Sequence, residues 1–388
     1  MHNFVYHNPT KVLFGRGTIN VCGQEIQQIG ERVLLVYGRA WAAKSGLLEH
    51  VESILQKAGL KITAFGGVQP NPTLEHVRKG IHLCKENKID VVCALGGGSV
   101  IDSAKAIGAG ALAGHDVWKF FTGKKSVKNA LPLVAISTMA SSGSEINSGM
   151  VLTNTELSLK FGFAHRLLFP QVAIMDPETT YSVSANYTAY GAIDALAHLL
   201  EFYMTTRQSG IEVQKQYMEG LGRAIALGCR DALNQPANYE ARATLMWAAG
   251  LALNGLAAAG LGKVGFPMHL IEHSLSALYD IPHGAGLAVI IPGWLRYNAR
   301  ILPDRICHFI NQVFGGEFSG NRGTIQAIEK FEKWMTSIGL ATTLAELGVA
   351  GTQIEQLAEN ALPLARIWRI QGYDTAKVSD ILNLCGPS

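Results

Sequence analysis

Two pairs of residues, each spaced four apart, have the side chains needed to bind a metal ion. Asp194 and His198 form one pair, and His269 and His273 form the other. This spacing places both members of a pair on one face of a helix. His283 follows ten residues later, beside a proline that restricts the backbone. One carboxylate with imidazoles suits Fe²⁺ or Zn²⁺, with Mn²⁺, Co²⁺ or Ni²⁺ as alternatives, and the spacing leaves open which of the three later histidines are ligands.

Either pair could instead lie on a helix surface or make an ordinary core contact. The sequence around Asp194 argues against this, because residues 191–197 read Gly-Ala-Ile-Asp-Ala-Leu-Ala. A carboxylate buried in such an apolar run needs a counter-charge, and a metal ion supplies one. With one coordination position left open, the site would act as a Lewis acid.

A glycine triplet followed by a serine, residues 96–99, lies between an expected strand and an expected helix. Backbone N–H groups at such a junction favour a phosphate, and glycine lets the backbone approach it closely. The pattern is neither G-x-G-x-x-G nor a P-loop, and a tight turn is the alternative interpretation. A second polar loop, residues 137–145, follows another expected strand and suits ligand binding, although alone it would be read as an ordinary capped loop.

The secondary structure expected from the sequence changes near residues 177–184, from alternating strands and helices to helices. Before this boundary, buried strands are expected at 32–37, 60–65, 90–95, 131–137 and 171–176. Helices that begin at the caps Ser45 and Thr73 are expected between the first three of these strands. This alternation of strand and helix predicts a parallel sheet flanked by helices. After it, helices are expected at 184–206, 209–229, 237–261, 267–279, 300–314, 321–338 and 374–385.

Composition excludes several classes of protein. The 388 residues are 48% hydrophobic and 16% charged, which predicts a large core and no extensive disorder. A net charge of +3 makes no case for nucleic-acid or membrane-surface binding. The six cysteines form no C-x-x-C pair, and we expect no signal peptide, so a reducing cytoplasm is predicted. The uncharged stretch 243–262 is rich in Ala and Gly, which favours a helix buried all round over a membrane span.

Together these motifs resemble the iron-containing (group III) alcohol dehydrogenase family over essentially the whole chain. Within it, the sequence is most similar to NADPH-dependent aldehyde reductases and butanol dehydrogenases. The family usually has a proline where Ser184 stands, which affects only the start of a helix. The matching positions are Pro70-Asn71-Pro72, Gly96–Ser99, Asp102, Lys105, Thr138, Gly143–Glu145, Asp176-Pro177, Gly191, Asp194 and Pro282–Gly284.

The resemblance implies two domains with separate tasks. Residues 1–180 would form an α/β dinucleotide-binding domain with a Rossmann-like, dehydroquinate-synthase-like fold. Residues 181–388 would form an all-α domain for metal and substrate, with the metal in the cleft between the domains. The metal ligands implied are Asp194, His198, His269 and His283.

The same resemblance implies roles around the cofactor. His273 matches a non-ligand histidine near the nicotinamide, where it could relay a proton, and Asp102 matches a cleft residue beside the cofactor. These two residues are the expected catalytic residues. The pyrophosphate loop would comprise Gly97, Gly98 and Ser99, and the other dinucleotide contacts would be Asn71, Thr138, Asn147 and Lys160.

The turn Gly38-Arg39-Ala40-Trp41 bears on the choice of cofactor. NAD-preferring relatives carry an Asp there, and NADP-preferring relatives often carry a Gly-Gly-Gly-Ser run, whereas this chain has neither. Without the acid, and with Arg39 and Lys160 able to meet a 2′-phosphate, NADP is expected over NAD. Arg39 could instead stack on the adenine or face solvent.

The expected activity is reversible hydride transfer between NADP(H) and a primary alcohol or aldehyde, assisted by one Fe²⁺ or Zn²⁺ ion. A metal- and NAD-dependent lyase of the dehydroquinate-synthase type is an alternative, but residues 262–283 hold one Lys and no Arg for a phosphorylated acid. A non-catalytic protein that binds nucleotide and metal is another. The family also implies a homodimer that pairs through an N-terminal strand at about residues 4–14.

Overall fold

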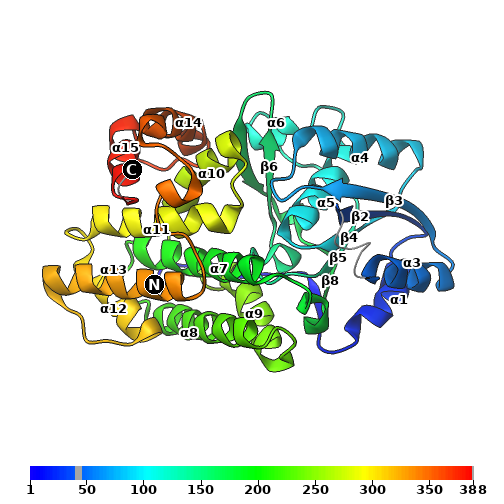
Figure 1. Ribbon diagram of the computed structural model, residues 1–388. Helices are drawn as coiled ribbons and strands as arrows, with labels where there is room; N and C mark the ends of the chain where they lie inside the picture. Colours follow the sequence, from blue (N-terminus) through cyan, green and yellow to red (C-terminus); the bar gives the residue numbers. More distant parts are fainter. Residues whose placement is uncertain (40–45, 387–388) are drawn as a thin grey trace. The chain divides into compact units, whose positions relative to one another are not determined.

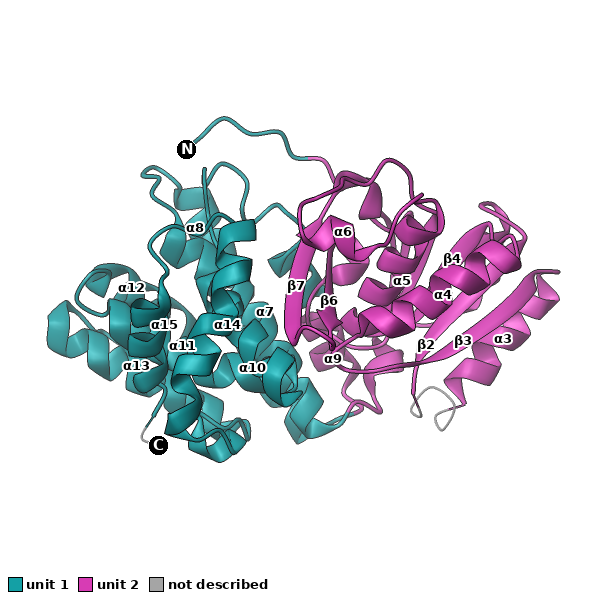
Figure 2. Ribbon diagram, turned by 90° about the horizontal axis from the view of Figure 1, so that it is seen from above, with its two compact units in different colours: residues 1–6, 184–236, 247–388 teal, residues 7–183, 237–246 magenta. Residues whose placement is uncertain are grey.

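The computed structural model describes residues 1–39 and 46–386, which form two compact units (Figures 1 and 2). The sheet unit contains residues 7–183 and 237–246, and the helical unit contains residues 1–6, 184–236 and 247–388. An α/β region is thus followed by a helical region, which confirms the predicted fold class. The assignment of dinucleotide binding to residues 1–180 and of metal and substrate binding to residues 181–388 stays a prediction.

The strands of the sheet unit form a parallel six-stranded sheet in the order β1-β8-β5-β4-β2-β3. The apolar runs of the inner strands are buried, as expected of a sheet covered on both faces. The five strands predicted from the sequence are confirmed with small shifts at their ends. The strands are β1 (Lys11–Phe14), β2 (Arg32–Gly38), β3 (Lys61–Val68), β4 (Val91–Gly96), β5 (Leu133–Ser137) and β8 (Val172–Met175).

The expected strand at about residues 4–14 is wrong in length. Only residues 11–14, which form β1, pair with the sheet. Their partner β8 also has four residues, and the register runs from Lys11 opposite Val172 to Phe14 opposite Met175. Residues 4–10 form no strand among the described residues. β1 is the first strand in the order of the sheet and lies at its edge, beside β8.

The helices of the sheet unit follow the strands. Thr73 caps α4 as predicted, because its side-chain oxygen accepts a hydrogen bond from the backbone N–H of His76 at 3.3 Å. The predicted cap Ser45 lies outside the described residues, and Gly46 is the first described residue before α3. These helices are α1 (Cys22–Gln27), α3 (Leu47–Lys57), α4 (Leu74–Glu86), α5 (Gly98–Ala111) and α6 (Trp118–Phe121).

An antiparallel hairpin, which the sequence did not lead us to expect, follows the second polar loop. Its strands are β6 (Gly149–Asn154) and β7 (Leu159–Ala164). The turn between them is closed by the Asn154 side chain, whose Oδ1 accepts a hydrogen bond from Leu157 N–H at 3.3 Å. Apolar residues on β6 and β7 are buried, so the hairpin is part of the sheet unit's core.

Among the described residues after 184, seven of the predicted helical segments or parts of them are present, together with two helices that were not predicted. These helices belong to the helical unit, except that residues 239–246 of one of them belong to the sheet unit. The two that were not predicted are α11 and α14, and each has an internal proline, at Pro292 and Pro363, that interrupts the expected helical pattern. The helices are α7 (Ala185–Thr205), α8 (Glu212–Asn234), α9 (Tyr239–Ala252), α10 (Pro267–Tyr279), α11 (His283–Asn298), α12 (Pro303–Phe314), α13 (Gly320–Ser337), α14 (Ile354–Ile367) and α15 (Thr375–Asn383).

The uncharged stretch 243–262 does not form the long buried helix that we expected. α9 ends at Ala252, where Asn254 Oδ1 accepts a hydrogen bond from Leu256 N–H at 2.9 Å and Gly255 has a φ of 95°. Trp247 is exposed, so α9 is not buried all round. Among the described residues, every helix is too short or too polar to cross a membrane.

A close approach of helices fixes the start of α11 in the helical unit. A Cβ atom added to Gly284 would lie 2.4 Å from the carbonyl oxygen of Tyr190 in α7 and 2.6 Å from its Cα. Both atoms belong to the backbone and cannot rotate away. A side chain at this position would therefore push α11 away from α7.

We predict that Gly284→Ala lowers the free energy of unfolding by about 1–3 kcal/mol, because the added methyl group overpacks the contact with Tyr190. Gly220→Ala is the matched control, since the nearest atom to a Cβ there is 3.9 Å away and alanine favours a helix. Urea unfolding of both variants measures the difference. Equal stability of the two variants would contradict the prediction.

Candidate metal centre

Four side chains of the helical unit meet around one carboxylate oxygen. Asp194 and His198 lie one turn apart on α7, His269 lies near the start of α10, and His283 is the first residue of α11. The Nε2 atoms of His198, His269 and His283 lie 3.7, 3.5 and 3.6 Å from Oδ1 of Asp194. Ligand atoms bound tetrahedrally to one ion at about 2.1 Å lie about 3.4 Å apart. These residues therefore fit a single divalent metal ion.

Burial of the cluster is uneven. Asp194, His198 and His269 are each at most 5% exposed, whereas the side chain of His283 is 27% exposed. A buried carboxylate needs compensating positive charge, which a protonated imidazole or a metal ion between the four side chains would supply. The partial exposure of His283 leaves one side of the cluster accessible.

The structure distinguishes the positions of His269, His273 and His283, which their spacing in the sequence alone did not. His269 and His283 face Asp194 directly, whereas His273 lies one helical turn beyond His269. The ring centre of His273 is 6.4 Å from that of His269 and 5.7 Å from that of His283. His273 is buried beside the cluster, with one of its ring nitrogens within 4.8 Å of ligand atoms of Glu272 and His283.

Two buried glutamates, which sequence reasoning missed, orient the imidazoles. Glu201 Oε2 lies 2.5 Å from Nδ1 of His269, and its Oε1 accepts hydrogen bonds from the backbone N–H groups of Met268 and His269 at 2.6 and 3.0 Å. The carboxylate thus holds both the ring of His269 and the first turn of α10. Glu201 follows Asp194 by seven residues, a spacing that places both on one face of α7 and could have indicated its role.

Glu272 does the same for His283. Its Oε2 contacts Nδ1 of His283, and its Oε1 accepts a hydrogen bond from the Ser276 hydroxyl. A Cβ at Gly286 would lie 2.8 Å from Cγ of Glu272, so glycine leaves room for the glutamate. A carboxylate on Nδ1 directs Nε2 toward a metal and makes it a better ligand.

The electrostatics of the cluster suit a cation. Burial opposes ionisation of Asp194, but the three imidazoles hold the pKa of its carboxyl well below the usual range. Burial lowers the pKa of His198 to about 3, which keeps this imidazole neutral and able to bind a metal. Burial also disfavours a charged His269, yet Glu201 and Asp194 raise its pKa to about 10. A metal ion between the same atoms would take the place of that proton.

Aromatic rings form an apolar wall beside the cluster. Phe266 meets His198 and His269 edge-on, with ring centres 6.4 and 5.7 Å apart. Trp368, directly after α14, lies 5.3 Å from His273 and 6.1 Å from Phe266 by the same measure. These rings place apolar surface on one side of the candidate metal position.

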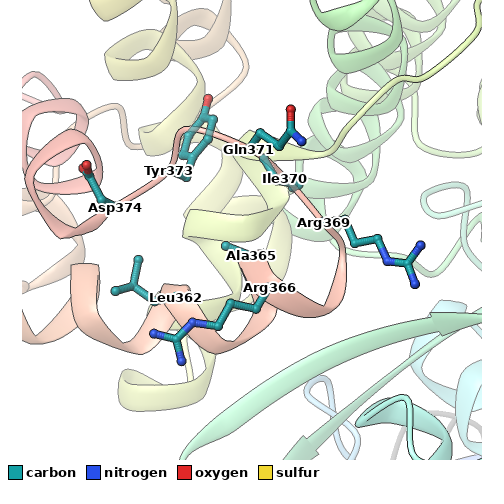
Figure 3. Close-up of a pocket in the computed structure, with 8 residues that line it drawn as sticks. All are labelled: Leu362, Ala365, Arg366, Arg369, Ile370, Gln371, Tyr373 and Asp374. Atoms are coloured by element: carbon teal, nitrogen blue, oxygen red, sulfur yellow. The ribbon is translucent and has the colours of Figure 1, made fainter.

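A groove of about 490 Å³ lies between the end of α14 and the start of α15 (Figure 3). Residues on both sides of Trp368 in the sequence line it. Its lining includes none of the four candidate ligands. The lining residues are Leu362, Ala365, Arg366, Arg369, Ile370, Gln371, Tyr373 and Asp374.

The two polar loops predicted to bind a ligand pack together in the sheet unit. Gly96 ends β4, and its carbonyl accepts a hydrogen bond from Thr138 N–H, just after β5, at 3.1 Å. A Cβ at Gly98 would lie 2.3 Å from Oγ of Ser142, and one at Gly97 would lie 3.2 Å from Cβ of Met139. The triplet is therefore required by this packing as well as by any close ligand.

Other predicted cofactor residues lie at the same edge of the sheet. Lys160 donates a hydrogen bond to Oδ1 of Asn71 at 3.0 Å, and the Ser99 hydroxyl donates one to the carbonyl of Pro70 at 2.5 Å. Asp102 and Asn147 are buried and make hydrogen bonds within the protein.

The predicted turn after β2 is only partly described. Gly38 pairs with Val68 at the end of β2, and Arg39 is exposed, while Ala40 and Trp41 lie outside the described residues.

Comparison with known proteins gives matches over nearly the whole chain. The sequence model "Iron-containing alcohol dehydrogenase" matches residues 9–177, and "Fe-containing alcohol dehydrogenase family, C-terminal" matches residues 188–386. A probable NADH-dependent butanol dehydrogenase 1 of Bacillus subtilis is 38% identical over 98% of this chain and 99% of its own length. The NADPH-dependent aldehyde reductase YqhD of Escherichia coli is 32% identical over 92% of both chains. The crystal structure of NADH-dependent butanol dehydrogenase A of Thermotoga maritima superposes with a TM-score of 0.96 and 38% identity, covering 100% of this chain and 99% of that one.

We predict that Glu201→Gln and Glu272→Gln each weaken metal affinity by about 10- to 100-fold, because an amide orients the imidazole less strongly than a carboxylate. Chelator competition with Zn²⁺ measures the affinity. Glu219→Gln is the matched control, since Glu219 is also buried but contacts Tyr203 at 2.7 Å and Nε2 of His308 at 3.2 Å, neither of which is a candidate ligand. Unchanged affinity in both test variants would show that the glutamates do not support a metal.

Proposed function

The chain belongs to the iron-containing alcohol dehydrogenase family, and from this premise we propose that it transfers a hydride reversibly between NADP(H) and a primary alcohol or aldehyde. Membership in the family makes the protein an alcohol dehydrogenase, an oxidoreductase. The cofactor preference, the ligand set and the roles of single residues are our proposals.

Asp194, His198, His269 and His283 would hold one divalent ion, Fe²⁺ or Zn²⁺. The observation that carries this assignment is the placement of three Nε2 atoms within 3.7 Å of one buried carboxylate oxygen. When bound, such an ion supplies Lewis-acid polarisation of the substrate oxygen. The expected position of the ion in a cleft between the domains stays a prediction.

The chain's own residues would orient the reactants and move a proton. Phe266 and Trp368 would exclude water from the reacting carbon, while the accessible side at His283 would admit substrate. His273 would relay the proton that the alcohol oxygen loses or gains, because it is buried next to His269 and His283. An apolar wall suits an alcohol or aldehyde with a hydrocarbon tail better than the phosphorylated acid that a related lyase would bind.

The nicotinamide dinucleotide, which supplies the hydride chemistry, would bind at the carboxyl edge of the parallel sheet. This edge of an open α/β sheet is the usual place for such a ligand. The phosphates would face the start of α5, where backbone N–H groups are available. The residues that we propose to contact it are Gly38, Arg39, Asn71, Gly97, Gly98, Ser99, Asp102, Thr138, Asn147 and Lys160.

NADP is proposed over NAD on local sequence. Residues 38–45 contain no Asp or Glu that would bind the ribose hydroxyls of NAD, and Arg39 is exposed at the end of β2. Lys160 could add a second positive charge, although its ammonium group already contacts Asn71. The names of similar proteins include both cofactors, since the butanol dehydrogenases are called NADH-dependent and the aldehyde reductase is called NADPH-dependent.

A homodimer through β1 and a cytoplasmic location complete the proposal. Among the strands that the structure describes, β1 pairs only with β8, so its other edge can pair with a second copy. Phe14 on this strand is 37% exposed, which adds apolar surface at the same edge. All six cysteines are free and buried, which supports a reducing compartment. A monomer by light scattering would remove the dimer.

We predict that protein stripped by a chelator loses NADPH oxidation with butyraldehyde and regains it with Fe²⁺ or Zn²⁺. We expect kcat/KM to be higher with NADPH than with NADH, and Arg39→Ala to reduce that preference. Spectrophotometry of both cofactors in parallel provides the internal control. Dinucleotide binding without aldehyde reduction under any metal would contradict the activity, and an equal or higher kcat/KM with NADH would contradict the NADP preference.

We predict that His273→Ala slows turnover by roughly 100-fold or more while metal content stays near that of the wild type, because the variant loses a proton relay and no ligand. His269→Ala serves as the comparison and should lose the metal. Metal content and kcat measured on the same samples separate the two. Loss of metal from the His273 variant would make His273 a ligand and break the assignment.

A further inference from the structure

A buried lysine in the sheet unit has no part in the reaction proposed above. Lys105, on α5, is 2% exposed. Its ammonium group donates hydrogen bonds to Oγ of Ser144 at 2.8 Å and to the carbonyl oxygens of Asn147 and Gly149 at 2.9 and 2.7 Å, and it lies 3.3 Å from Oδ1 of Asn147. All these acceptors belong to residues 144–149, the segment that leads from the second polar loop into β6.

Asp102 binds the same part of the chain from one turn earlier on α5. Its Oδ1 accepts a hydrogen bond from the Ser144 hydroxyl at 2.6 Å, and its Oδ2 accepts one from the backbone N–H of Val151 at 2.9 Å. Both carboxylate oxygens are therefore used to hold residues 144–151. Lys105 and Asp102 meet at Ser144, which accepts from one and donates to the other.

The segment held by these residues is connected to the proposed cofactor contacts. The Asn147 amide donates a hydrogen bond to the carbonyl of Ser142 at 3.0 Å, and Ser142 packs against Gly98 at the start of α5. The hairpin that begins at Gly149 carries Lys160, which contacts Asn71. A shift of residues 144–149 would displace three of the groups proposed to bind the dinucleotide.

Burial of the Lys105 ammonium group costs free energy that its interactions must offset. Burial lowers its pKa to about 8, while the nearby carboxylates of Asp102 and Glu145 act in the opposite direction. A buried ion pair of this kind often contributes little net stability, since apolar side chains of similar volume pack as well. A methionine at this position would have a similar volume but could not donate hydrogen bonds to residues 144–149.

We propose that Lys105, together with Asp102, is a positioning residue that fixes residues 144–149 against α5 and so holds the dinucleotide site in its binding geometry. This inference rests on the proposed function, and it gives Asp102 a positioning role in place of direct catalysis.

The test compares dinucleotide affinity in Lys105→Met with that of the metal-loaded wild type. We expect the Kd for NADPH, from fluorescence titration, and the KM for NADPH to rise at least tenfold, with the loss falling on KM more than on kcat. Ser103→Ala is the matched control, because Ser103 is a buried neighbour on α5 whose hydroxyl has no hydrogen-bond partner among the described residues. Its Kd should stay within twofold of the wild type.

Ser144→Ala keeps the inference testable if Lys105→Met does not fold, since it removes only the hydroxyl that Lys105 and Asp102 share. We expect its Kd for NADPH to rise severalfold. We expect the loss of NADPH affinity in the double variant Lys105→Met/Asp102→Asn to be smaller than the product of the losses in the two single variants. Both side chains hold the same segment, so their effects are not independent.

Wild-type affinity in Lys105→Met and Ser144→Ala, accompanied only by a lower melting temperature, would overturn the inference and leave the proposed function intact. A wild-type protein that binds neither NADPH nor NADH would overturn the proposed function and, with it, this inference.

Discussion

The helical unit is organised around one electrostatic constraint, the burial of the Asp194 carboxylate among three imidazoles. Its Oδ1 has an Nε2 atom of each imidazole within 3.7 Å, and the residue is 2% exposed. Such a carboxylate is stable inside a protein only when positive charge is held close to it. The divalent ion that we propose for the same four side chains would satisfy this requirement.

The surrounding structure supports that arrangement at several levels. Glu201 and Glu272 each hold the far nitrogen of one imidazole, and Glu201 also binds the first turn of α10. Gly284 lets the start of α11 approach α7 closely enough for His283 to reach Asp194. The sheet unit uses the same kind of device, since a buried lysine and a buried aspartate hold the loop beside its glycine turn. In both units, buried charges position the residues that are proposed to bind ligands.

The sequence predicted the fold class and most elements, but not the contacts between them. Spacing of four brought out Asp194 and His198, and the strands predicted from apolar runs match β2 to β5 and β8. Helices α11 and α14 were missed because an internal proline interrupts each pattern. The expected helix 237–261 was too long because the side chain of Asn254 turns the chain. Glu272 acts through a pairing between α10 and α11, which no local pattern records, whereas the spacing of seven between Asp194 and Glu201 on α7 was the available signal for Glu201.

X-ray absorption spectroscopy of the zinc-loaded protein tests the central claim most directly, because it reports the ligand atoms themselves. We expect a first shell of nitrogen and oxygen at about 2.0–2.2 Å, with the multiple scattering of three imidazoles. In His283→Ala this should fall to two imidazoles. A shell containing sulfur, or one with fewer than three imidazoles in the wild type, would contradict the assignment of Asp194, His198, His269 and His283.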